Sequence, residues 1–97
     1  MLAEFGYEYD SSLMHQDLPC FVKQVCSKAK PVVELPVEWC LDDYSAFEVH
    51  RKPPREVHEI WQAEFDALYV ENSFLMLTVH PEIIGRASRI QMLREFV

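Results

Sequence analysis

Basic residues are scarce in this 97-residue chain, which has 9 Lys and Arg against 16 Asp and Glu and a formal net charge of -7. Nucleic-acid-binding proteins present basic faces to phosphates, so this balance argues against a nucleic-acid partner. It argues equally against an anionic membrane surface. Long apolar runs are also missing, because even a run such as residues 74–77 is far shorter than the roughly 20 residues of a membrane-spanning helix. The N-terminus lacks the basic start and apolar core of a signal peptide, so we expect a cytoplasmic protein without a membrane partner.

Cysteine is limited to Cys20, Cys26 and Cys40, and none of the three lies in a C-x-x-C or zinc-finger spacing. Free, partly buried thiols in a reducing compartment are therefore expected. A disulfide between Cys20 and Cys26 is geometrically feasible, but no sequence pattern supports it. The chain also lacks G-x-S-x-G, P-loop and dinucleotide-binding glycine patterns, which argues against those enzyme classes.

Apolar residues make up 49% of the chain and aromatic residues 12%, a composition that excludes global disorder and predicts a modest core. The N-terminal part reads as short elements: a helical turn at 2–5 ended by Gly6, then β-like segments at 7–13, 21–25 and 32–39. Pro36 predicts that the last of these is an edge, an end or a bulge.

The C-terminal part reads as a polar loop at 41–54, a helix at 55–71, a strand at 74–79 and a helix at 88–97. Apolar residues recur at three- and four-residue spacing in the 55–71 segment, whereas the 74–79 run is nearly uninterrupted. Such a run predicts an interior parallel strand, paired on both sides and buried on both faces. The order of elements predicts an α/β architecture, and both ends of the chain look cut, so we expect a piece of a longer domain.

Several polar or aromatic residues are candidates for chemistry. His80 follows the predicted strand, where α/β proteins place active sites, and its ring can exchange a proton near neutral pH. The alternative is a loop histidine bonded to backbone. Trp39 could line a sugar pocket or lie half-buried in the core, and the Asp42–Asp43 pair could fix a hydroxyl or an arginine or form a turn. Arg86 could reach an anionic group or lie on the surface, and Arg89 is expected to be a structural ion-pair partner.

Three ordered segments resemble the NodB-homology polysaccharide deacetylases. Residues 5–14 resemble their G-F-x-Y-D-S-S-L-M stretch, and residues 34–43 their E-[IL]-P-V-x-W-x-L-D-D segment. Residues 77–81 with 85–89 resemble their L-T-x-H-P and G-R-x-x-R segments. The resemblance is greatest to the branch with peptidoglycan deacetylase-like and allantoinase-like proteins. Cys20 stands where this family's loop has an aromatic residue.

The resemblance implies a divalent-metal-dependent, zinc-like hydrolase on a distorted β/α barrel, acting on an N-acetyl sugar or a cyclic amide. Residues 1–97 would be a single incomplete segment, the C-terminal part of that domain and hence a partial barrel. The family's metal-binding and general-base motifs are absent from the chain, so no metal ligand is assigned. His80 would be the catalytic general acid, with Trp39, Asp42 and Arg86 binding substrate.

Two functional hypotheses follow from the resemblance. In the first, the chain is part of an amide-hydrolysing enzyme that acts on a glycan or small molecule. In the second, it is a non-catalytic fragment that acts only in binding or assembly, with self-association through incomplete barrel edges.

Overall fold

The computed structural model describes residues 2–22 and 30–97, which form two compact units, Met1–Val37 and Glu38–Val97. The element order in the first unit is a 3₁₀ turn at Leu2–Phe5 followed by strands β1 (Tyr9–Asp10), β2 (Cys20–Val22) and β3 (Val32–Glu34). Gly6 ends the first turn at φ +82°, as the sequence predicts, since glycine adopts this left-handed conformation without a steric penalty.

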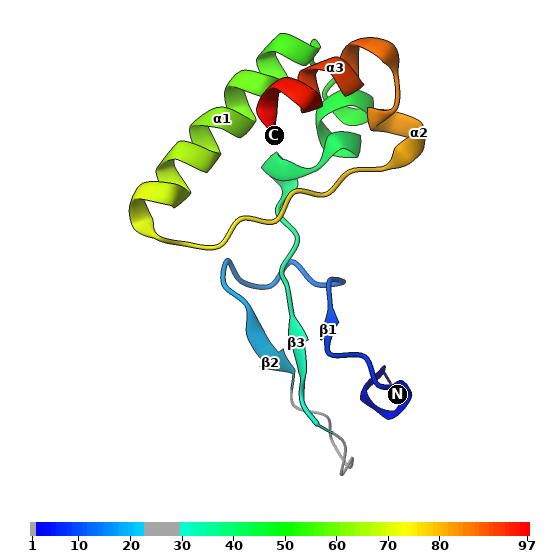
Figure 1. Cartoon of the computed structure of the whole chain (residues 1–97), viewed down its shortest axis with the longest axis vertical. Helices are drawn as coiled ribbons and strands as arrows, with labels where there is room; N and C mark the ends of the chain where they lie inside the picture. The colour runs from blue at the N-terminus through cyan, green and yellow to red at the C-terminus, as the bar shows by residue number, and fades with distance from the viewer. Residues whose placement is uncertain (1, 23–29) are drawn as a thin grey trace. The chain divides into compact units, whose positions relative to one another are not determined.

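The first unit contains a three-stranded sheet of order β1-β3-β2 (Figure 1). β1 pairs with β3 in parallel, whereas β2 pairs with β3 antiparallel and places Cys20 opposite Glu34. The predicted strand at 32–39 is shorter than expected, because β3 ends two residues before Pro36, which lacks a backbone donor. Residues 23–25 of the predicted second strand, and Cys26, lie outside the described residues.

Glu34 links β3 to the loop that follows β1. Its side chain is buried, with 1% exposed, and Oε1 accepts hydrogen bonds from the backbone N–H groups of Ser12 (2.9 Å) and Leu13 (2.7 Å). A buried carboxylate needs such donors to replace lost water. The loop is therefore tied to the sheet by one side chain.

The second unit is mainly helical (Figure 1). It contains a 3₁₀ turn at Trp39–Leu41, a π-helical turn at Ser45–Val49, and helices α1 (Pro54–Glu71), α2 (Pro81–Ile84) and α3 (Ala87–Phe96). The predictions of α1 and α3 are confirmed. The prediction of a polar loop at 41–54 is wrong, because this segment carries Leu41 and Phe47 into the core.

In the core of the second unit, side chains of α1 and α3 pack around the ring of Trp61. Trp61 is fully buried, its Nε1–H donates to the carbonyl of Cys40 at 3.0 Å, and Phe96 of α3 packs edge-on against it. The other fully or nearly buried members of this core cluster are Leu41, Phe47, Val57, Ile83, Ile84 and Met92. The indole therefore joins α1 to the Trp39–Leu41 turn through both apolar and polar contact.

The segment 74–79 does not form the predicted strand with partners on both sides. Within the described residues it makes one isolated parallel bridge, between Asp42 and Thr78, and residues 74–78 are only partly buried. Leu75 and Leu77 pack on the core cluster from one side. The packing of these side chains on the core accounts for the apolar sequence of the segment. Its backbone pairs with one neighbouring segment of the described chain, so it is not an interior strand.

None of the described helices combines the length and apolar character needed to cross a bilayer.

Candidate active site

The bridge between Asp42 and Thr78 brings two distant segments together. The backbone N–H of Thr78 donates to Leu41 at 2.8 Å, and that of Asp43 donates to Thr78 at 3.1 Å. This pairing places Asp43 beside His80, which lies 37 residues further along the chain. Pro81 begins α2 and biases the preceding residue toward extended backbone, and His80 is extended at φ -111° and ψ 127°.

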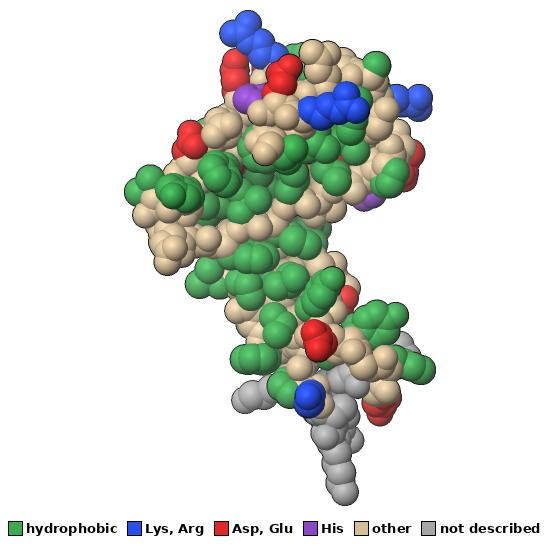
Figure 2. All heavy atoms as spheres, in the orientation of Figure 1, with side chains coloured by type: hydrophobic (Ala, Val, Ile, Leu, Met, Phe, Trp, Pro, Cys, Tyr) green, Lys and Arg blue, Asp and Glu red, His purple; other side chains and the backbone are tan. Residues whose placement is uncertain are grey.

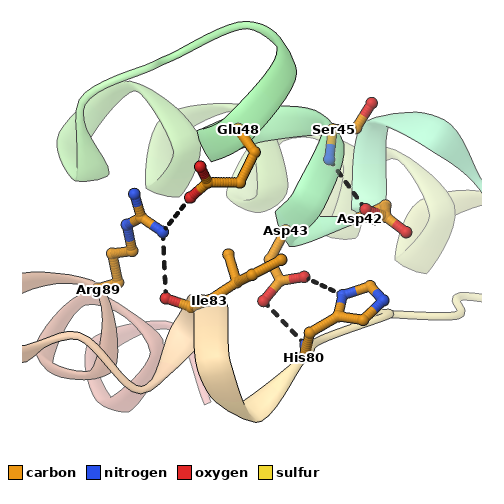
Figure 3. A network of polar contacts seen from close by, with 7 residues as sticks. All are labelled: Asp42, Asp43, Ser45, Glu48, His80, Ile83 and Arg89. Atoms are coloured by element: carbon orange, nitrogen blue, oxygen red, sulfur yellow. Dashed lines mark hydrogen bonds and ion pairs between the residues drawn. The ribbon is translucent and has the colours of Figure 1, made fainter.

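Asp43 holds His80 at two points (Figure 3). Oδ2 accepts the backbone N–H of His80 at 2.9 Å, and Oδ1 lies 2.6 Å from ring Nδ1. The Asp43 side chain is completely buried, whereas 41% of the His80 side chain is exposed. An ionised carboxylate can only accept, so Nδ1 carries the hydrogen and Nε2 is the other ring nitrogen available for proton transfer.

The hydrogen bond to Asp43 raises the pKa of His80 above its ordinary value, against an opposing contribution from burial. The negative charges of Asp43, Asp42 and Glu82 act in the same direction as the hydrogen bond. The raised folded-state pKa stabilises the fold, and this contribution is complete below the unfolded-state pKa of histidine. It is lost as the pH rises through the folded-state pKa. The site thus keeps an imidazolium at higher pH than free histidine does.

Asp42, for which substrate binding stays a prediction, accepts the backbone N–H of Ser45 at 3.0 Å through Oδ1 (Figure 3). This bond satisfies a donor at the start of the π-helical turn, in the manner of a helix cap. The sequence singled out the Asp42–Asp43 pair without separating its members. In the structure Asp43 is the residue that hydrogen-bonds to His80. No spacing rule in the sequence distinguishes it from Asp42.

Trp39 and Arg86 lie apart from these hydrogen bonds. Trp39 is 61% exposed and borders a surface hollow of about 280 Å³, whose lining residues do not include His80 or Asp43. Arg86 is exposed at the start of α3, and its side chain makes no hydrogen bond or ion pair with residues 2–22 or 30–97. Their roles in substrate binding remain predictions.

Arg89 has the structural role that the sequence predicts. Its guanidinium donates to Glu48 Oε1 at 2.8 Å and to the carbonyl of Ile83 at 3.2 Å (Figure 3). The guanidinium carbon also lies 4.4 Å from the centre of the Phe47 ring. These contacts join the π-helical turn to the end of α2, the short helix that begins directly after His80. Arg89 therefore supports the backbone near the site without taking part in its hydrogen bonds.

Asp43 Oδ1 and His80 Nδ1 have the geometry of a hydrogen bond rather than of two ligands to one ion. Asp42, Asp43 and His80 bring potential ligand atoms within 4.8 Å of one another. However, two ligands bound to zinc at about 2.0–2.2 Å in tetrahedral geometry lie about 3.3 Å or more apart. The 2.6 Å separation of Asp43 Oδ1 and His80 Nδ1 is too short for an ion to join these two atoms. Both oxygens of Asp43 are already used by His80.

We expect this chain alone to bind no zinc at stoichiometric occupancy. In the Asp42, Asp43 and His80 cluster of the described residues, Asp43 and His80 Nδ1 hydrogen-bond to each other and Asp42 Oδ1 accepts a backbone N–H. Equilibrium dialysis against zinc, followed by metal analysis, measures the occupancy. One tightly bound equivalent that disappears in His80→Ala, but not in the exposed His50→Ala control, would contradict this expectation.

Comparison with known proteins supports the resemblance over nearly the whole chain. No family model matches. A peptidoglycan deacetylase from Helicobacter pylori (strain ATCC 700392 / 26695) is 26% identical over 95% of this chain. Among solved structures, a chain assigned as a polysaccharide deacetylase from Mycobacterium smegmatis is 37% identical over 98% of this chain, with a TM-score of 0.82. Puue allantoinase is 26% identical over 96%, with a TM-score of 0.80.

These matches show that the chain shares the mixed α/β fold of its solved relatives. Within that fold class it is a relative of the polysaccharide deacetylases and allantoinase, as its three sequence segments predicted. The chain spans 42% of the Helicobacter protein and 35% and 32% of the two solved chains.

Proposed function

We propose that this chain is part of a polysaccharide deacetylase-like hydrolase that cleaves amide C–N bonds, in an N-acetyl sugar or a cyclic amide. The observation that carries the proposal is the pairing of a buried carboxylate with a half-exposed histidine, at 2.6 Å. The matches to two deacetylases and an allantoinase extend over nearly the whole chain and support this reaction class. The pair by itself fits proton donation rather than nucleophilic attack.

In the proposed reaction His80 is the general acid. When an amide is cleaved, the departing nitrogen must gain a proton, because an amide anion is a very poor leaving group. Nε2 of His80 gives this proton, while Asp43 holds Nδ1–H and the imidazole in one orientation. The neutral histidine then regains a proton from solvent. Trp39, Asp42 and Arg86 are proposed to contact substrate once the remainder of the site is present.

The remaining parts of the proposal concern the whole protein. Residues 1–97 are proposed to be the C-terminal part of one longer domain, forming part of a distorted barrel. A zinc-like divalent metal ion is proposed for that protein, with ligands other than Asp43 and His80, and a cytoplasmic location is proposed from the thiols of Cys20 and Cys40, which are free. A glycan or small-molecule substrate is proposed on the same grounds.

The non-catalytic alternative has its own structural support. The described groups that meet at His80 are the carboxylates of Asp42 and Asp43, and the sequence lacks the metal-binding and general-base motifs of the family it resembles. Hydrophobic side chains are visible on the surface of the second unit (Figure 2). The exposed large hydrophobic residues of α1 include Phe65, Tyr69 and Val70. Such a surface would suit self-association or assembly with another segment.

An assay of amide hydrolysis distinguishes the two functions. This chain and a longer version that includes any upstream coding sequence are tested with an N-acetyl oligosaccharide and with a cyclic amide. Enzymatic function predicts acetate or ring-opened product from the longer version. If the longer version folds and hydrolyses neither substrate, the non-catalytic function is supported instead.

Asp43→Asn should move the basic limb of the activity profile to lower pH. A general acid must be protonated, so activity falls as the pH rises through the pKa of His80. Removing the Asp43 charge and acceptor removes the largest cause of the raised pKa. On that limb, each pH unit by which the pKa of His80 falls lowers the protonated fraction of His80 about tenfold. NMR titration of the His80 ring provides a direct measurement in the same variant, and unchanged titration would show that Asp43 does not set its proton affinity.

A further inference from the structure

The first unit contains a second titratable pair, Cys20 and His15, which the proposed hydrolysis does not use. Cys20 Sγ lies 3.6 Å from His15 Nε2, within hydrogen-bonding range for sulfur. Cys20 is half-buried at the start of β2, and His15 is exposed in the preceding loop. The thiol is therefore both paired with a base and within reach of small solutes.

Local structure holds the two side chains close. Pro19 fixes the backbone directly before Cys20, and the side chain of Gln16 donates to the carbonyl of Leu18 at 2.6 Å. Cys20 is also aligned with Glu34 across the β2–β3 pairing. The contact between sulfur and imidazole is thus supported from the loop and from the sheet.

We propose that Cys20 and His15 form a reactive thiol–imidazole pair that is modified by small disulfides and other soft electrophiles. His15 Nε2 accepts the thiol proton, and the thiolate attacks one sulfur of a disulfide. A new S–S bond forms, the original S–S bond breaks, and the departing thiolate takes the proton from His15. The products are a mixed disulfide on Cys20 and one free small thiol.

Cys40 provides an internal comparison. Burial, followed by the charges of Glu64 and Glu38, raises the pKa of the Cys40 thiol to about 11. Little of it is ionised near neutral pH, and because the thiolate is the nucleophile, it should react slowly.

The test is limited labelling of the native full chain with iodoacetamide near pH 7, followed by trypsin digestion and mass spectrometry. The cleavable sites at Lys23 and Lys28 place Cys20, Cys26 and Cys40 on separate peptides, so each rate is read independently. We expect Cys20 to react at least about tenfold faster than Cys40, and His15→Ala to slow Cys20 by about tenfold. The Cys40 rate should not change, and the control His50→Ala should leave the Cys20 rate unchanged.

A second measurement distinguishes an effect of the His15 contact on the Cys20 rate from an effect of solvent exposure alone. In urea the Cys20 rates of the parent chain and His15→Ala should converge, because the contact exists only in the folded loop. Labelling with 5,5′-dithiobis(2-nitrobenzoate) should show the same His15 dependence and release one coloured thiolate for each Cys20 modified. Equal native rates in the parent chain and a folded His15→Ala variant would overturn the proposal.

Discussion

Replacing His80 with Ala in the complete protein should slow amide cleavage by roughly 10²–10⁴-fold, the usual contribution of general acid catalysis. The loss should fall mainly on kcat, because the imidazole protonates the departing nitrogen and the proposed substrate contacts lie on other residues. The kcat and thermal midpoint are measured on the same variant, with the exposed His50→Ala as a control. If His80 only fixes its loop, the midpoint falls while kcat per folded molecule is unchanged, and His80 is then removed from the mechanism.

The largest expected effect on stability comes from Trp61. Trp61→Ala removes a fully buried ring and its hydrogen bond to the Cys40 carbonyl, and should lower the free energy of unfolding by about 3–5 kcal/mol. Trp39→Ala is the matched control, since its ring is 61% exposed, and should cost much less. Urea unfolding followed by circular dichroism compares the two without relying on tryptophan fluorescence. Equal losses would mean that the ring of Trp61 is not central to the second unit.

Elements with strong local signals were predictable from sequence. α1 and α3 follow from apolar periodicity, and α1 ends at Asn72, which adopts the left-handed conformation at φ 52°. The buried Leu41 and Phe47 were missed because they lie among polar residues, and their burial depends on packing against α1 and α2. Local sequence carries no information about such a partner.

The candidate site was predictable only in part. His80 was identified from its position after an apolar run, although that run makes a single bridge in the described chain. Asp43 could not be distinguished from Asp42, because the choice depends on backbone pairing with Thr78 across a long sequence separation. Proximity of His15 to Cys20 was also beyond the sequence patterns, since it depends on the loop conformation before β2.

The two hydrogen bonds between Asp43 and His80 affect the energy needed to transfer a proton to or from the His80 ring. One carboxylate accepts hydrogen bonds from both the backbone N–H and ring Nδ1 of His80, so the backbone and the imidazole are both held in place. Nε2 can therefore gain or lose a proton without rotation of the ring or exchange of the Nδ1 partner. A surface histidine must reorder water around a mobile ring at each transfer, whereas here the charge-stabilising group is already in position. The pair should consequently transfer protons with low reorganisation energy.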